Sequence, residues 1–585
     1  MADLPFHAAD ADRGFIAKLA PAVIRTADGR VIWDGDSYEF VHGECPQTTH
    51  PGLWQHAQLC ARHGLYEVAP RLYQVRGLDL ANMTLIEGDT GVVVVDPLSC
   101  TEAAAAALKL YRAHRGPRPV TGVVYTRSHA GHFGGVRGVT GGGVPVLAPA
   151  GFMEHAVAET LYAGPALTRR AVYAYGPALP RSPEGQIGGG FGLTVSMGTL
   201  SLIPPTLEVS RTGQEETVDG VRLLFQPGPD GGMTFLLPGH RALCLTESAG
   251  RRPLLSPRGG SVGDARARAR ALNEAITLFA GRADVAFAAH HWPTWGREAI
   301  TAFLAERRDL YAYVHDQTLR LFNKGLTGAE IAEALRLPPE LARACDGTTG
   351  HDVKAVYQRY LGWFDGNPAH LWEHPPRESA IRYVECLGGG AAVVEHARRY
   401  LNENDLRFAA QLLGHAVFAD EGNKEARDLL AEVYTRLGHG AGNAAWRNFY
   451  LMGALELADG IVPATADTAP SRDVLAALNV EQIFDSLAIR IDGPRAWHER
   501  LAIDWHLTDL GERHRTTLSN GALIHQPDPP DENADLTLRL TKAQLLGLLT
   551  GKGVEGVERE GDTTALRRLV AVLDHPVPDF AIVTA

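Results

Sequence analysis

Residues 82–126 contain the pattern that most constrains the fold of this chain. NMTLIEGDTGVVVVDPL, at 82–98, consists of two strand-like runs joined by GDTG, which favours a hairpin turn. TEAAAAALKLYRAH at 101–114 is helical, and VTGVVYT at 120–126 is a further strand. Another strand run, VRLLFQPGP, follows at 221–229. Strands that alternate with helices in this way predict a layered α/β fold.

The chain as a whole divides into three parts of different character. Its 585 residues are too many for one hydrophobic core, so about two to four domains are expected. Residues 1–315 carry the alternation of strands and helices. Residues 316–460 are amphipathic helices with almost no strand signal, and a capping box runs from Thr327 to Glu330. Strands return in residues 461–585.

The third part predicts a small α+β domain with a mostly antiparallel sheet. LAIRIDG at 487–493 is expected to be a strand, as are 501–511 and 534–549. An Asn-Gly pair at 520–521 predicts a hairpin turn between two more strands.

Composition excludes several classes of function. The net charge of −12, without a block of Lys or Arg, argues against nucleic-acid binding. The six cysteines are scattered with no CxxC pair, which is typical of reduced thiols and predicts a cytoplasmic protein. We see neither a signal peptide nor an apolar run of about 18 residues, so no membrane span is expected.

Two histidines follow the strand at 120–126. In YTRSHAGHFGGVRG (125–138), His129 and His132 are three positions apart on a loop. Imidazole nitrogen is a preferred ligand of zinc and similar ions, so the loop is a candidate metal site. The competing interpretation is that both are ordinary loop histidines.

Other metal-ligand side chains also come directly after strand runs. His290 and His291 follow DVAFAA, Glu247 follows ALCL, and Asp230 lies in a Gly/Pro turn after a strand. Sites in α/β folds commonly form at strand ends, so these side chains are expected to converge.

Several long segments resemble one known family. They are LYEVAPRLYQVRGLDLANMTLIEGDTGVVVVDPL, GTLSLIPPT, LCLTES, HHWPTWG, WFDGNPAHLWEHPPRESAIRYVECLGG and AWRNFYLMGALEL. The chain resembles the alkylsulfatases of the metallo-β-lactamase superfamily, which hydrolyse linear alkyl sulfates such as dodecyl sulfate. The resemblance implies a metallo-β-lactamase αββα sandwich at 1–315, an all-α dimerisation domain at 316–460 and a sterol-carrier-like domain at 461–585. It also implies a homodimer.

The resemblance maps the family's metal motif onto the histidine loop. That motif is T-H-S-H-x-D-H, and with two glutamates and a later histidine it binds two zinc ions. Its matching positions here are Thr126, Ser128, His129 and His132. Arg127 stands in place of the first histidine, and Gly131 in place of the aspartate.

The remaining ligands map onto later strand ends. Asp230 falls near a family glutamate, Glu247 matches the glutamate that bridges both metals, and His291 matches the later histidine, with His290 as the alternative. Each metal site therefore keeps three of its ligands and loses one. The sets retained are His129, Asp230 and Glu247 for one site, and His132, Glu247 and His291 for the other.

The two replacements predict an impaired dinuclear site. Arginine has no lone pair to donate, and its fixed charge repels a dication. Arg127 is instead expected to pair with Asp230 or Glu247, while Gly131 offers no side chain. We expect one zinc ion or none. The ligands of a single ion would be His129, His132, Glu247 and His291, with Glu247 beside the attacking water and Arg127 as the second catalytic residue.

The substrate side is partly kept. Arg258, in RGGSVGD, matches an arginine that holds the sulfate in the family, and Gln186, in GQIGGG, resembles a glutamine near the substrate. The alternatives are a surface arginine that caps a turn and a residue of a glycine loop.

Three functions remain open from the sequence. The first is a diverged metal-dependent hydrolase that acts on an anionic ester with an apolar tail. The second is a metal-poor pseudoenzyme that binds an anionic amphiphile. The third is an enzyme repurposed for non-hydrolytic chemistry in specialised metabolism. The substrate is in each case a small amphiphilic anion.

Overall fold

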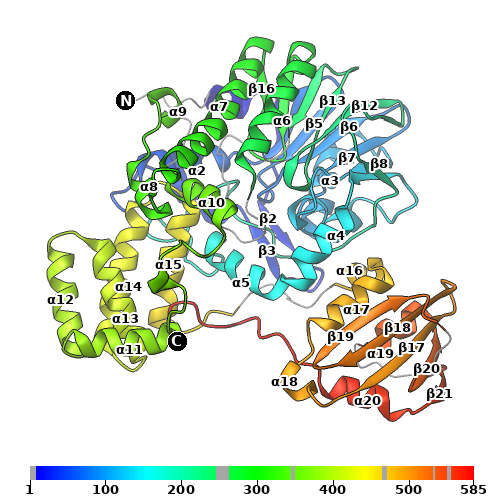
Figure 1. Ribbon diagram of the computed structural model, residues 1–585. Helices are drawn as coiled ribbons and strands as arrows, with labels where there is room; N and C mark the ends of the chain where they lie inside the picture. Colours follow the sequence, from blue (N-terminus) through cyan, green and yellow to red (C-terminus); the bar gives the residue numbers. More distant parts are fainter. Residues whose placement is uncertain (1–7, 246–262, 344–348, 464–470, 531–533, 550–554) are drawn as a thin grey trace.

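Two β-sheets form the middle layers of the first part of the chain. The computed structural model describes residues 8–245, 263–343, 349–463, 471–530, 534–549 and 555–585 (Figure 1). The larger sheet has eight strands in the order β1-β4-β5-β6-β7-β8-β9-β10, and the smaller has six in the order β11 to β16. The strands of the larger sheet are β1 (Phe15–Ala17), β4 (Gly64–Ala69), β5 (Leu72–Arg76), β6 (Met83–Glu87), β7 (Val92–Val95), β8 (Val120–Val124), β9 (Val146–Pro149) and β10 (Leu207–Val209). Those of the smaller are β11 (Glu215–Val218), β12 (Val221–Pro227), β13 (Met233–Leu237), β14 (Ala242–Leu245), β15 (Val285–Ala288) and β16 (Thr294–Trp295).

Helices cover the outer face of each sheet. One core joins the sheets and contains Val93 of β7 and Phe235 of β13. A second core lies between the larger sheet and α3 (Thr101–Arg115), and a third lies between the smaller sheet and α6 (Ala265–Leu278) with α7 (Arg297–Phe322). The four valines of β7 are all buried because both faces of the sheet are covered. The predicted αββα sandwich is therefore confirmed.

Local sequence signals account for several element boundaries. GDTG forms the turn between the antiparallel strands β6 and β7. Asp264 begins α6, since its side chain accepts a hydrogen bond from the backbone N–H of Ala267. Both hydrogen bonds of the predicted capping box at Thr327 are present at the start of α8 (Gly328–Ala334).

The middle part of the chain is helical, as expected. Its elements are α8, α9 (Pro339–Arg343), α10 (Thr349–Leu361), α11 (Pro376–Cys386), α12 (Gly390–Asn402), α13 (Leu406–Ala419), α14 (Lys424–Gly440) and α15 (Ala444–Asp459). The predicted boundary at 315/316 lies inside α7, a continuous helix of 26 residues. Residues of α7 on both sides of this boundary pack into the same hydrophobic core. Among the described residues, no helix combines the length and the apolarity needed to span a bilayer.

The third part contains a five-stranded sheet in the order β19-β18-β17-β20-β21. Its strands are β17 (Leu501–Leu507), β18 (Glu512–Ser519), β19 (Ala522–Pro527), β20 (Leu536–Leu540) and β21 (Glu558–Gly561). Asn520 and Gly521 form the predicted hairpin turn, both with positive φ. The strand predicted at 487–493 is wrong, because α17 (Val480–Ala488) extends into it. A capping box begins this helix, and its buried face makes helix the better solution. The strand predicted at 534–549 is wrong in its second half, which forms α19 (Lys542–Leu549), because Lys, Ala, Gln and Leu favour helix there.

A buried ion pair joins the parts of the chain. Arg169 of α5 (Gly164–Tyr175) donates a hydrogen bond to the carboxylate of Glu456 on α15, and both side chains are almost completely buried. Glu456 also accepts from the hydroxyl of Tyr173 at 2.6 Å and from the backbone N–H groups of Ile582 and Val583 at 2.7 and 3.2 Å. The segment after the third domain thus returns to the helical part, as its red trace shows in Figure 1.

Candidate functional site

The histidine loop is anchored by an aspartate from the neighbouring strand. Asp96 directly follows β7 and accepts hydrogen bonds from the backbone N–H and the hydroxyl of Thr126, at 2.8 and 2.7 Å. Its second oxygen lies 3.1 Å from Nδ1 of His132, which is 1% exposed. A carboxylate at Nδ1 fixes the orientation of the ring and makes Nε2 the ligand nitrogen, as in many metal sites.

His290 faces His132 from the end of β15. Its Nδ1 lies 2.8 Å from the carbonyl oxygen of Leu80, and its ring stacks on Phe191 with centroids 4.4 Å apart. The His132 and His290 rings are 5.6 Å apart and nearly perpendicular. Both imidazoles are therefore oriented through Nδ1 by an oxygen acceptor, the arrangement found in histidines that bind metals.

His291 lies in a different environment. Its backbone φ of 64° is unusual for a residue other than glycine, and its Nε2 lies 3.2 Å from Nε2 of His56. The sequence predicts His291 as the later ligand, with His290 as the alternative, and the geometry favours His290.

The rest of the loop is more exposed. His129 is on the surface, where its Nδ1 accepts a hydrogen bond from the backbone N–H of Gly131 at 3.3 Å, and its ring lies 6.3 Å from that of His132. Arg127 pairs through its backbone with Gly232, which places this loop beside the turn that carries Asp230.

Asp230 is bound to an arginine within the protein. Its carboxylate accepts from Nε of Arg268 at 2.9 Å and from the backbone N–H of Asp264 at 3.4 Å. Burial by itself works to lower the pKa of Arg268, yet its contacts with Tyr311 and Asp230 raise that pKa above its usual value. Arg268, from α6, is thus a permanent cation beside the carboxylate expected to bind a metal. We had not foreseen this contact.

Gln186 is 0% exposed and its amide bonds to the surrounding protein. The side-chain nitrogen donates to the carbonyl oxygens of Tyr175 and Leu193, at 3.2 and 3.0 Å, and the oxygen accepts from the hydroxyl of Tyr38. These bonds hold the loop that contains it. Its role at the substrate stays a prediction.

Two predicted site residues, Glu247 and Arg258, lie outside the described residues. Asp96, in contrast, was missed from the sequence. The signal was present, since Asp96 follows the four valines of β7 just as the histidine loop follows the next strand, β8.

Comparison with known proteins fits this geometry. Family models match at residues 76–231 (metallo-beta-lactamase superfamily), 327–460 (alkyl sulfatase dimerisation) and 468–585 (alkyl sulfatase C-terminal). The chain is 41% identical to a linear primary-alkylsulfatase of Pseudomonas sp, over 98% of this chain and 89% of that one. It is 40% identical to an alkyl/aryl-sulfatase of Saccharomyces cerevisiae, over 98% and 92%. The solved structure of the stereoselective inverting sec-alkylsulfatase Pisa1 from Pseudomonas sp. matches with a TM-score of 0.96 and 40% identity, covering 100% of this chain and 96% of that chain.

A sandwich of two sheets with histidines at the strand ends, together with the first family match, defines a protein of the metallo-β-lactamase superfamily, whose members depend on metals. Within that superfamily, the chain belongs to the family of alkylsulfatases.

Proposed function

We propose that the chain is a diverged alkylsulfatase that hydrolyses an anionic ester with an apolar tail, and that it uses one zinc ion rather than two. The observation that carries this proposal is the pair of buried, pre-oriented imidazoles of His132 and His290. The names of the relatives support alkyl sulfates as the substrate class. The match to the dimerisation model supports a homodimer.

The residues present fit one metal ion better than two. His132 and His290 would hold it, with His129 and Glu247 as the predicted further ligands. Arg127 and Gly131 occupy two positions of the family motif without a donor atom, and Arg268 already neutralises Asp230. When bound, the ion would lower the pKa of a water molecule and so supply the nucleophile.

The chain itself supplies orientation and charge. Asp96 and the carbonyl of Leu80 hold the two rings through Nδ1, so that little reorganisation is needed during catalysis. The guanidinium of Arg127 is proposed to bind the sulfate group, together with Arg258, because a guanidinium offers paired donors to an oxyanion.

The test is sulfate release from dodecyl sulfate by the purified protein, before and after removal of metal by a chelator. We expect release that is lost with the metal and restored by zinc. A protein purified without metal would contradict the one-metal hydrolase and favour an amphiphile-binding pseudoenzyme. Bound metal without sulfate release would favour non-hydrolytic chemistry instead.

Replacement of Asp96 by asparagine should weaken zinc binding about 10- to 100-fold, because the neutral amide no longer stabilises the orientation of His132. Zinc titration against a competing chelator measures this effect. Asp219→Asn is the matched control, since Asp219 also accepts several hydrogen bonds, but from Thr90 and Gly91 at the hairpin turn. An equal loss of affinity in both variants would contradict the role given to Asp96.

The double variant Arg127→His with Gly131→Asp should bind one more metal ion per chain than its parent. It restores both missing donors, and a Cβ at Gly131 would make only ordinary contacts, at 3.4 Å to His129 and 3.7 Å to Ser99. Metal analysis of the dialysed protein measures the ratio. Arg137→His with Gly141→Asp makes the same chemical changes outside the motif. Unchanged stoichiometry in the first variant would show that the motif has been mapped wrongly.

A further inference from the structure

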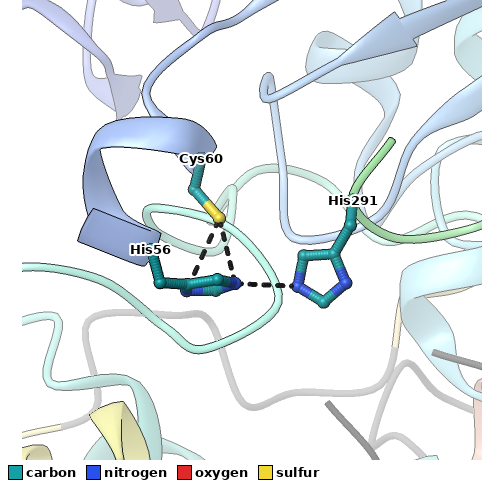
Figure 2. Close-up of side chains that lie close together, drawn as sticks. All are labelled: His56, Cys60 and His291. Atoms are coloured by element: carbon teal, nitrogen blue, oxygen red, sulfur yellow. Dashed lines mark hydrogen bonds between the residues drawn. The ribbon is translucent and has the colours of Figure 1, made fainter. Parts of the chain in front are cut away.

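We infer that His56, Cys60 and His291 form a second metal site, for a borderline cation such as Zn²⁺, beside the pair of His132 and His290. The nearest ligand atoms of the three side chains all lie within 4.8 Å of one another (Figure 2). Two imidazoles and a thiolate are donors that zinc prefers. This site goes beyond the proposed function and does not depend on it.

The fold brings the three side chains together from distant parts of the sequence. His56 and Cys60 are four residues apart on α2 (Pro51–Cys60), so they share one face of that helix. His291 reaches them because its positive φ turns it away from His290, and its carbonyl oxygen is held by the side chain of Asn82 at 2.7 Å. The strained backbone of His291 therefore serves to place a third donor.

The two imidazoles are arranged as ligands of one ion would be. Two histidines bound to one zinc at a tetrahedral angle have nitrogens about 3.3 Å apart and ring centres about 5.2 Å apart. Here the two Nε2 atoms are 3.2 Å apart and the ring centroids 5.1 Å apart. Without an ion the two rings are within hydrogen-bond distance of each other, and Nε2 of His291 also lies 3.3 Å from the carbonyl oxygen of Gly190, so a bound ion would replace both contacts.

The sulfur is within reach of the same position. Sγ of Cys60 lies 3.6 Å from Nε2 of His56, near the distance of about 3.6 Å expected between sulfur and nitrogen in a zinc tetrahedron. It is also 3.8 Å from Nδ1, which places it over the face of the ring (Figure 2). Binding would therefore require a rotation of the Cys60 side chain toward Nε2.

A small pocket offers room for a fourth ligand. It has a volume of about 30 Å³, enough for a water molecule, and Cys60, His291 and Asn82 are among its lining residues. Three protein ligands and one open position are typical of zinc sites that activate water. Nitrogen and sulfur donors suit Zn²⁺, whereas Mg²⁺ prefers oxygen ligands, so zinc is expected and Mg²⁺ is not.

Cobalt provides the first test. The protein is freed of metal with a chelator and titrated with Co²⁺. A thiolate bound to Co²⁺ gives a charge-transfer band in the near ultraviolet, and we expect one such band per chain in the wild type. Zn²⁺ should abolish the band, and Mg²⁺ in excess should not. A fully titrated wild-type protein without the band would overturn the inference, whatever its sulfatase activity.

Variants and alkylation identify the ligands. The band should be lost in Cys60→Ser and in His56→Gln, together with one equivalent of metal. The band should be kept in His132→Gln, which loses only the metal held by His132, and in Cys45→Ser, which removes an exposed cysteine elsewhere. Zn²⁺ should also slow the alkylation of Cys60 in the wild type, but not that of Cys45, and this readout needs no variant that must fold. If the band is lost in Cys45→Ser, or if it is still present in Cys60→Ser, the inferred site is wrong.

Discussion

Sulfate release from dodecyl sulfate should fall on the order of a thousand-fold when His132 is replaced by glutamine, because a bound metal contributes several kcal/mol to the stabilisation of a transition state. His132 is buried between Asp96 and the ring of His290, and the amide oxygen of glutamine binds zinc much more weakly than an imidazole nitrogen does. The ratio kcat/KM and the zinc content per chain should fall together.

His514→Gln is the control for this variant. His514 is also a buried histidine beside a carboxylate, Glu512, but it lies on β18 in the third part of the chain. Its loss should leave both kcat/KM and zinc content unchanged. If His132→Gln keeps its activity while losing zinc, the reaction does not use the metal held by His132, and the proposed function is wrong.

Replacement of Glu456 by glutamine should lower the free energy of unfolding by about 3–5 kcal/mol, since it leaves the guanidinium of Arg169 buried without its counter-charge. The same change weakens the acceptor used by Tyr173 and by the backbone of Ile582. Thermal and urea denaturation measure the loss, and limited proteolysis near residues 580–583 should reveal earlier opening of that segment.

A double variant separates charge from packing at this position. Arg169→Met combined with Glu456→Met removes both charges, and it should be more stable than Glu456→Gln alone. Glu425→Gln is the exposed control, because its partner Arg398 is on the surface, and it should change stability little. A Glu456→Gln protein as stable as the wild type would mean that the ion pair does not join the parts of the chain.

Much of the fold could be predicted from local sequence. The valines of β7, the hairpin at Asn520 and the capping box at Thr327 act over a few residues, and each was found where it was expected. The strands predicted at 487–493 and in the second half of 534–549 are wrong. Leu487 belongs to the apolar face of α17, a pattern that begins at Val480, and residues 542–549 form α19.

The site was predictable in part only. Strand ends indicated His132 and the pair of His290 and His291, and the family motif favoured His291, whereas the geometry favours His290. The partners of Asp230 and His291 are remote in sequence. Arg268 is 38 residues from Asp230, and His56 is 235 residues from His291, so no local pattern could join them.

The ion pair between Asp230 and Arg268 makes one part of the site independent of metal supply. A chelator can remove zinc, and a shortage of zinc in the surroundings can leave a site empty. A guanidinium that belongs to the chain can be neither extracted nor exchanged, and it keeps its charge throughout the ordinary pH range. The turn that carries Asp230 should therefore keep its structure in metal-free protein, while the loop of His132 responds to the ion.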